Sequence, residues 1–316
     1  MTQCVLVTGG QGFIGRAIVA QLVELGRVEV LALTRQAPAA NPVAGATYLP
    51  GGDLASQTEW QPALTNVHAI VHLAARVHVM HDAEADPLTV FRAVNVEGTL
   101  NLGRQAAAAG VKRFVFISSV KVNGEATLPG RPFTPDDIPA PQDPYDVSKM
   151  EAEQGLRQLS VDTGMEVVII RPPLVYGPGV KANFAALMRA VRRGWPLPLG
   201  MVHNQRSLVA LDNLVDFIVT CITHPQAANQ TFLVSDGQDL STTELVRGVA
   251  QAAGVPVRLV PVPVWVLQTG ALLLGKGDVV RRLCGNLQVD ISKARSLLGW
   301  VPPVSVEEGL RRAMAA

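Results

Sequence analysis

The sequence predicts an α/β protein with a doubly wound parallel sheet of the Rossmann type. Short apolar runs rich in β-branched residues alternate with segments of helical periodicity in the first half of the chain. A glycine-rich stretch lies directly between the first strand and the first helix. With 316 residues, 48% of them hydrophobic, the chain can also bury the large core that such a fold needs.

The expected strands are short, and helical segments separate most of them. They cover residues 4–9, 28–35, 46–54, 68–75, 112–119 and 166–172, with a returning strand within 230–236. Strands that alternate with helices at this spacing form parallel sheets through right-handed crossovers.

Pro and Gly cluster after Pro172, and the later elements are mostly helical. We therefore expect a dinucleotide-binding domain at 1–175, with a returning segment at about 205–235. A smaller, mainly helical substrate lobe is expected at 176–204 and 236–316.

The charge and cysteine patterns exclude several classes. The net charge is +1 without a charge run, so no nucleic-acid partner is expected. The three cysteines lie far apart, which indicates reduced thiols in a cytoplasmic protein, and no metal site is expected. The first strand begins within the first few residues, which leaves no room for a signal peptide.

Residues 262–275 are almost wholly apolar. The stretch is shorter than the ~20 residues that a spanning helix needs, so no stable membrane insertion is expected. A buried or interface helix is the first interpretation, and contact with a membrane surface is the second.

The glycine-rich stretch has the spacing G-x-x-G-x-x-G at Gly9, Gly12 and Gly15. Glycines at these positions allow a tight turn, close approach of the backbone to a pyrophosphate and close helix packing. Phe13 and Ile14 open the helix, whose N-terminus favours phosphate. These five residues are the first predicted cofactor contacts.

The end of the second strand bears on which cofactor is used. Thr34 stands where an NAD-binding carboxylate is expected, and Arg35 follows. A guanidinium can pair with a 2′-phosphate, so NADP(H) is favoured and NAD(H) is possible. Arg35 could instead be a solvated surface residue. Asp53 and Leu54 suit the adenine edge, although Asp53 could equally be a turn residue.

A candidate reactive centre follows the fifth strand. Tyr145 and Lys149 are four residues apart and share a helix face if the helix has begun there. A free tyrosine has a pKa of about 10, which a neighbouring ammonium, together with the positive nicotinamide of an oxidised cofactor, lowers. Ser118 and Ser119 end the strand at the sheet edge where ligands bind. Ser119 could polarise a carbonyl, or either serine could merely cap the turn.

Seven motifs in order resemble the extended short-chain dehydrogenases/reductases of the nucleotide-sugar epimerase/dehydratase family. They are TGGQGFIG, GGDL, HLAA, NVEGT, SSVKVNG, YDVSK and RPPLVYGPG. The resemblance implies a catalytic set of Ser119, Tyr145 and Lys149, with Asn95 supporting the lysine. Asn95 could otherwise make a purely structural hydrogen bond. The same motifs extend the expected cofactor contacts to Leu73, Ala74, Ala75, Tyr145, Lys149 and Pro172.

The chain departs from the family pattern just after Ser119. Family dehydratases usually carry an Asp-Glu pair where this chain has Val120 and Lys121, so dehydration is not expected. Lys121 could contact the substrate or be a solvated loop lysine.

The resemblance also implies substrate contacts in the C-terminal half. It points to Asn183, to Leu199 through its backbone, to Arg206, and to Arg281 or Arg282, of which Arg282 is preferred. Arginines suit a nucleoside diphosphate. Each of these competes with an ordinary surface residue.

Three functions fit the sequence. The first is an enzyme that reduces a UDP-linked keto sugar, resembling bacterial reductases of UDP-4-keto-6-deoxy-N-acetylglucosamine. These form UDP-N-acetylquinovosamine or UDP-N-acetylfucosamine for surface polysaccharides such as lipopolysaccharide O-antigen. The second is a UDP-sugar 4-epimerase with tightly bound NAD, and the third is a non-catalytic NADP-sensing protein. We also expect a homodimer.

Overall fold

The computed structural model describes residues 3–35, 42–77, 86–275 and 277–315. Within these residues seven strands form one parallel sheet in the order β3-β2-β1-β4-β5-β6-β9. The predicted doubly wound α/β class is confirmed. The strands are β1 (Gln3–Thr8), β2 (Val28–Thr34), β3 (Thr47–Pro50), β4 (Val67–His72), β5 (Arg113–Ile117), β6 (Glu166–Arg171) and β9 (Thr231–Leu233).

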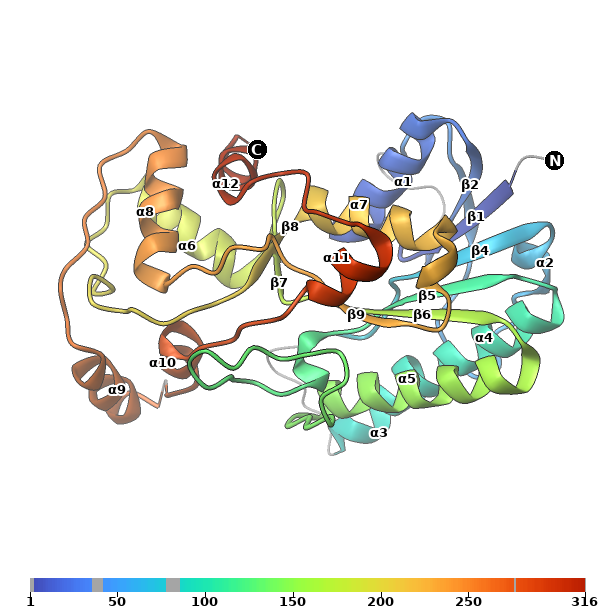
Figure 1. The fold of residues 1–316 in the computed structure, drawn as a ribbon, viewed down its shortest axis with the longest axis horizontal. Coiled ribbons are helices and arrows are strands. Elements are labelled where there is room, and N and C mark those ends of the chain that lie inside the picture. Colours follow the sequence, from blue (N-terminus) through green and yellow to red (C-terminus); the bar gives the residue numbers. More distant parts are fainter. Residues whose placement is uncertain (1–2, 36–41, 78–85, 276, 316) are drawn as a thin grey trace.

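Helices cover both faces of the sheet (Figure 1). One face packs against α1, α7 and α11, and the other against α2, α4 and α5. Because β1 lies between β2 and β4, the chain leaves the sheet in opposite directions there, and ligands bind at such a switch point. The helices are α1 (Phe13–Leu25), α2 (Gln61–Leu64), α3 (Pro87–Phe91), α4 (Thr99–Ala108), α5 (Pro144–Thr163), α7 (Leu211–Thr223) and α11 (Ser292–Leu298), with 3₁₀ turns η2 (Val120–Val122) and η3 (Pro225–Ala227).

The helical stretch between β4 and β5 is not one regular helix. A π-helical stretch, η1 (Arg92–Gly98), separates α3 from α4. A Cβ at Gly98 would lie 2.7 Å from the carbonyl oxygen of Leu54, so glycine allows the close approach. The wider turn places Asn95 in a buried position, and π-helical turns of this kind are frequent at functional sites.

The C-terminal half forms a mainly helical lobe beyond the sheet (Figure 1). Its core gathers around Tyr176 and Phe184, whose stacked rings have centroids 5.5 Å apart. We retain the domain division near residue 175 as a proposal. The elements of the lobe are β7 (Leu174–Tyr176), α6 (Ala182–Arg192), β8 (Leu208–Ala210), α8 (Thr242–Ala253), α9 (Val264–Leu273), α10 (Gly277–Cys284) and α12 (Val306–Met314).

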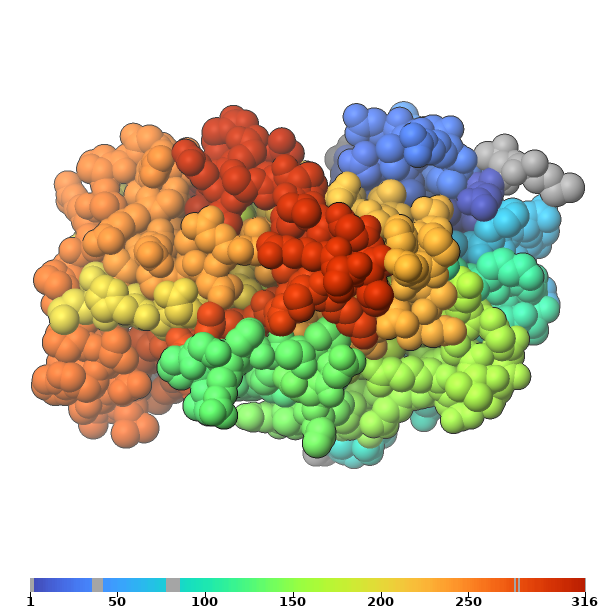
Figure 2. Space-filling model, in the orientation of Figure 1, coloured from blue at the N-terminus to red at the C-terminus, as the bar shows by residue number. Residues whose placement is uncertain are grey.

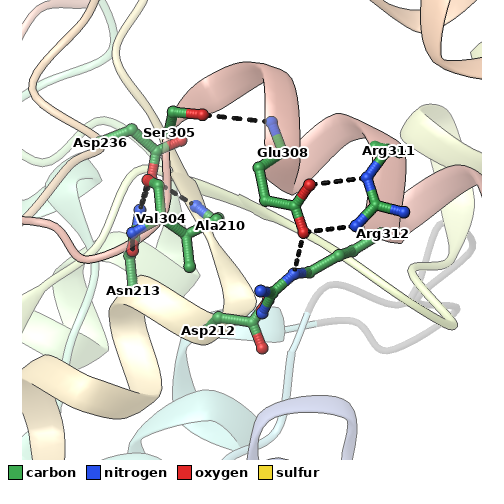
Figure 3. Close-up of polar contacts among 9 residues, drawn as sticks. All are labelled: Ala210, Asp212, Asn213, Asp236, Val304, Ser305, Glu308, Arg311 and Arg312. Atoms are coloured by element: carbon green, nitrogen blue, oxygen red, sulfur yellow. Dashed lines mark hydrogen bonds and ion pairs between the residues drawn. The ribbon is translucent and has the colours of Figure 1, made fainter.

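A buried carboxylate holds the segment after β9 to the start of α7 (Figure 3). Asp236 Oδ1 accepts hydrogen bonds from the Ala210 backbone and from Asn213 Nδ2, both at 2.7 Å. Asn213 also exchanges two hydrogen bonds with the backbone of Val304. These buried contacts connect the lobe to the sheet, whereas the ion pairs of Glu308 in the same view are exposed and contribute little.

The apolar stretch 262–275 forms α9 and the turn after it. Of the described side chains of α9, Ala271 is buried, and the others are half-buried or exposed. Of the two alternatives in the first interpretation, the buried helix is therefore wrong, and the interface helix stays a prediction. No helix of the described residues is both long and apolar enough to cross a membrane.

Candidate active site

The glycine loop turns the chain tightly from β1 into α1. Gly9 has φ +66°, and its carbonyl oxygen accepts a hydrogen bond from the Gly12 N–H at 2.8 Å. A Cβ at Gly15 would lie 2.1 Å from that same oxygen, so no larger residue fits there. The first turn of α1, with Phe13 and Ile14, contains no acidic residue. The loop therefore fits the pyrophosphate of a dinucleotide at a helix N-terminus.

The residues after β4 form the wall beside this loop. The Thr8 hydroxyl oxygen accepts hydrogen bonds from the backbone N–H groups of Leu73 and Ala74, both at 3.0 Å. A Cβ at Gly9 would lie 3.1 Å from the Ala74 nitrogen. The structure thus brings the predicted contacts at 73–75, including Ala75, beside the glycine loop.

His72 is buried and connects β1 to α4 through its two ring nitrogens. The sequence did not single it out as part of the site. Its Nδ1 lies 2.8 Å from the Thr8 hydroxyl and its Nε2 lies 3.0 Å from the Thr99 hydroxyl. Burial, followed by the charge of Lys149, lowers the pKa of His72 to about 3, so the ring is neutral. The position of this histidine in the HLAA motif was the available signal.

The end of β2 lies next to the glycine loop. The Gly10 N–H donates to the Leu33 carbonyl, and the Gly51 N–H donates to the Thr34 carbonyl. Thr34 is buried and Arg35 is exposed, which fits both interpretations of Arg35, and its contact with a 2′-phosphate stays a prediction. In the following loop Asp53 is exposed, and Leu54 packs against η1.

Tyr145 stands in the first turn of α5. Asp143 caps this helix, because its Oδ1 accepts a hydrogen bond from the Asp146 N–H at 2.9 Å, and Pro144 occupies the first position. The Tyr145 ring is half-buried and meets Phe91 edge-on, with centroids 5.9 Å apart. The helix has therefore begun at Tyr145, as its pairing with Lys149 requires.

Lys149 reaches the carboxyl end of β5. Its Nζ donates to the carbonyl oxygen of Ile117 at 2.8 Å and lies 4.5 Å from the centroid of Phe116. Burial lowers the pKa of this ammonium to about 8, although the charge of Glu153 acts in the opposite direction. Since Ser119 lies two residues after Ile117, the structure brings the tyrosine helix and the serine turn to one edge of the sheet.

The surroundings of Tyr145 bear on the pKa of its phenol. Burial raises the pKa of the phenol, and the carboxylates of Asp146 and Asp143 raise it further. Among the groups of the chain itself, burial and these two carboxylates outweigh the lowering of the Tyr145 pKa that is expected from Lys149. Tyr145 therefore remains a protonated phenol at neutral pH, which suits a proton donor.

Ser119 has a local structural partner. The Ser119 hydroxyl oxygen accepts from the Lys121 N–H at 3.2 Å, so this side chain does cap the turn η2. Pro172, also a predicted cofactor contact, accepts from the Val120 N–H at 3.0 Å. These bonds fix the turn at the edge of the site.

Asn95 supports the tyrosine helix one residue away from Lys149. Its Nδ2 donates to the Ser148 hydroxyl and to the Arg76 carbonyl, both at 3.0 Å, and its Oδ1 accepts from the Arg76 N–H at 2.8 Å. The structural hydrogen bonds considered for Asn95 are therefore present. Its support of the lysine remains a prediction.

Lys121 has carboxylate partners that the sequence analysis did not identify. Its Nζ lies 2.9 Å from Asp143, 3.5 Å from Asp146 and 3.4 Å from Glu125. Burial acts to lower the pKa of Lys121, but the hydrogen bond to Asp143 and the three negative charges raise it overall. The ammonium thus ties the Ser119 turn to the start of α5, and its predicted contact with substrate remains untested.

We predict that Asp146 makes stability depend on pH. Its side chain is buried, and burial raises its pKa from 3.8 to about 7. Ionising this group in the folded protein is thus unfavourable, so its contribution to stability falls as pH rises from about 4 to about 7. Relative to wild type, Asp146→Asn should gain stability across that window in urea unfolding. Asp162→Asn, at an exposed position of the same helix, is the control, and an equal pH trend in both variants would contradict the prediction.

The predicted substrate residues occupy separate parts of the lobe. Asn183 is exposed at the start of α6, and the carbonyl of Leu199 accepts a hydrogen bond from the Thr243 hydroxyl at 2.6 Å. Arg206 Nη1 donates to the Arg282 carbonyl at 2.8 Å. Burial, followed by the charge of Arg282, lowers the pKa of Arg206. Arg206 Nη1 also donates to the Gly285 carbonyl at 3.1 Å, so this guanidinium has structural partners, and the substrate contacts of Arg206 and Arg282 stay predictions.

The fold and this set of polar groups define a dinucleotide-dependent oxidoreductase. Residues 5–235 match the NAD dependent epimerase/dehydratase family. The chain therefore belongs to this family, as the seven motifs of the sequence indicate.

Individual relatives are similar along the full length of the chain. A UDP-glucose 4-epimerase of Vibrio cholerae is 51% identical over 317 residues, covering 100% of this chain and 96% of the relative. A GDP-6-deoxy-D-mannose reductase of Pseudomonas aeruginosa is 27% identical, covering 100% and 97%. The structure of MoeE5 in complex with UDP-glucose and NAD is 26% identical with a TM-score of 0.76, covering 98% and 97%.

Proposed function

We propose that the protein is an NADPH-dependent reductase of a UDP-linked 4-keto sugar. The observation that carries the proposed proton-donor role is the environment of Tyr145, and an exposed Arg35 after a buried Thr34 supports NADPH as the reductant. Asp143 and Asp146 flank its phenol, and together with burial they keep it protonated. A protonated phenol can give its proton to the oxygen of a ketone as that ketone is reduced.

Three side chains have distinct proposed roles. The nicotinamide of the bound cofactor supplies hydride to C4, and Tyr145 supplies the proton to the oxygen on that carbon. Ser119 donates a hydrogen bond to the same oxygen and stabilises its developing negative charge. The proposed role of Lys149, whose Nζ donates to the Ile117 carbonyl at the end of β5, is to supply positive charge to the reacting centre.

We predict that Arg35→Ala raises the KM for NADPH by about tenfold or more, with little change for NADH. The exposed guanidinium follows a buried Thr34 and has no neighbouring carboxylate on that strand end to repel a 2′-phosphate. Steady-state kinetics with both cofactors measure the effect. Arg16→Ala, at another exposed arginine near the glycine loop, is the control. Equal effects on NADPH and NADH would remove Arg35 from this role.

The proposed substrate is UDP-2-acetamido-2,6-dideoxy-4-hexulose, and the product is UDP-N-acetylquinovosamine or UDP-N-acetylfucosamine. Arg206 and Arg282 would bind its diphosphate, with Asn183, Leu199 and Lys121 as further contacts. The nucleotide sugars named for the Vibrio and Pseudomonas relatives support this substrate class. The proposal includes a cytoplasmic homodimer that serves O-antigen biosynthesis.

The relative of 51% identity favours a second candidate, a UDP-sugar 4-epimerase with tightly bound NAD. The two are distinguished by incubating the purified protein with NADPH and the 4-keto sugar. A reductase consumes one NADPH per sugar, and the product's C4 configuration identifies it. Interconversion of UDP-glucose and UDP-galactose by protein that retains NAD, with no net NADPH oxidation, would establish the epimerase instead.

A further inference from the structure

An exposed apolar surface covers α9 and the turn after it. The exposed fractions are 69% for Trp265, 75% for Leu272, 82% for Leu273 and 74% for Leu274. Val279 of α10 is also exposed, and α10 packs against α9. These five residues are called the α9 surface below. Clustered apolar groups of this size usually mark a surface that contacts a partner or a membrane.

The α9 surface is remote from the dinucleotide-binding half. In Figure 1 α9 lies at the outer end of the C-terminal lobe, and the N-terminus lies at the opposite end of the molecule. Figure 2 shows the same dark-orange segment on the outside of the lobe. A partner or membrane that contacts α9 would therefore not cover the sheet edge at which Tyr145 lies.

The segment of the sequence that contains the α9 surface is mainly basic. From residue 254 to residue 284 the sequence contains four basic residues, Arg258, Lys276, Arg281 and Arg282, and one acidic residue, Asp278, a net charge of +3. Arg258 and Arg281 are both exposed, and Arg281 lies in the last turn of α10. An apolar surface with a basic border is complementary to the anionic headgroups and acyl chains of a bilayer.

The residue types and the length indicate contact along a membrane rather than passage through it. Trp265 carries an indole ring, which favours the boundary between headgroups and acyl chains. The ten residues of α9 span about 15 Å, half of the ~30 Å hydrocarbon core. A second copy of the chain is the less suitable occupant, because a symmetric contact would bring equivalent arginine pairs toward one another.

We propose that the α9 surface docks the protein on the surface of an anionic membrane. The inference stands apart from the proposed reaction, because its test measures membrane binding and not turnover. Enzyme docked in this way would act on nucleotide sugar next to the bilayer, with the lobe toward the lipid and the dinucleotide-binding half away from it.

Flotation of the purified full-length protein with lipid vesicles tests the proposal. We expect binding to vesicles of phosphatidylcholine mixed with phosphatidylglycerol, and weaker binding to phosphatidylcholine alone. Salt should weaken the binding to anionic vesicles by screening the arginines. The double variant Leu272→Ser/Leu273→Ser should bind anionic vesicles at least about tenfold more weakly, because it removes two exposed leucines from contact with the acyl chains.

The matched control is Ile138→Ser/Val161→Ser, which removes two exposed apolar side chains elsewhere, 88% and 80% exposed. This control should bind vesicles like wild type. Circular dichroism and thermal unfolding verify that both variants are folded. The proposal is overturned if the wild-type protein does not bind anionic vesicles or if the two double variants bind these vesicles equally well. It is also overturned if sedimentation shows that the α9 surface holds a dimer which Leu272→Ser/Leu273→Ser dissociates.

Discussion

Tyr145→Phe is expected to lower kcat by about 10²–10⁴-fold while leaving the affinity for NADPH close to wild type. The substitution removes the hydroxyl group and keeps the aromatic ring that meets Phe91 edge-on at 5.9 Å. The helix cap at Asp143 and the contact of Lys149 with the end of β5 do not involve the phenol oxygen. The shape of the site should therefore survive while its proton donor is lost.

Single-turnover and steady-state kinetics, together with titration of NADPH fluorescence, separate these two effects. Tyr48→Phe is the matched control, because Tyr48 is also half-buried and its hydroxyl accepts a hydrogen bond from the Val43 backbone. This control should retain wild-type kcat. Wild-type turnover by Tyr145→Phe would show that another group gives the proton, and loss of NADPH binding would indicate a structural role for the hydroxyl.

Features set by local backbone constraints were readable from the sequence. Gly9 and Gly15 have no substitute in the loop, because one adopts a left-handed conformation and the other has no space for a Cβ. The strand order around β1 then follows from right-handed crossovers. The cofactor-binding end of the site is therefore predictable from the sequence.

Features that depend on burial were not readable. Asp146 stands next to Tyr145 in the sequence, but nothing there shows that its side chain is buried or that Lys121 reaches it from another segment. The rise that burial and the neighbouring carboxylates give to the pKa of Tyr145 could therefore not be predicted, and the lowering expected with an oxidised cofactor stays a prediction. Similarly, the apolar composition of residues 262–275 suggested burial, whereas α9 lies at the outer end of the lobe with its leucines exposed.

A buried ion pair beneath the site gives the largest expected effect on stability. Glu153 accepts two hydrogen bonds from Arg171, Nε to Oε1 at 2.9 Å and Nη2 to Oε2 at 2.6 Å, and both side chains are buried. The Ser118 hydroxyl donates to Oε1 at 2.6 Å, and Arg171 also donates to Asn123. The pair therefore connects β6, the serine turn and the tyrosine helix.

We predict that Glu153→Ala lowers the free energy of unfolding by about 3–5 kcal/mol, because it leaves the Arg171 charge buried without its carboxylate. Urea unfolding at neutral pH measures the change. Glu151→Ala is the matched control, since this neighbour on the same helix pairs with Arg92 at the surface and should have little effect. Comparable losses in the two variants would contradict the argument from burial.

The double variant Glu153→Leu/Arg171→Met separates the cost of an unpaired charge from the loss of the contact itself. Replacing both members of a buried pair by apolar side chains is often neutral for stability, so the double variant should recover most of what Glu153→Ala loses. The pH dependence of turnover should not return to that of wild type. The charge of Glu153 raises the pKa of Lys149, and burial alone would lower that pKa further. The lysine would then lose its positive charge at a lower pH, so the alkaline limit of turnover should move toward neutrality in a protein that is again stable.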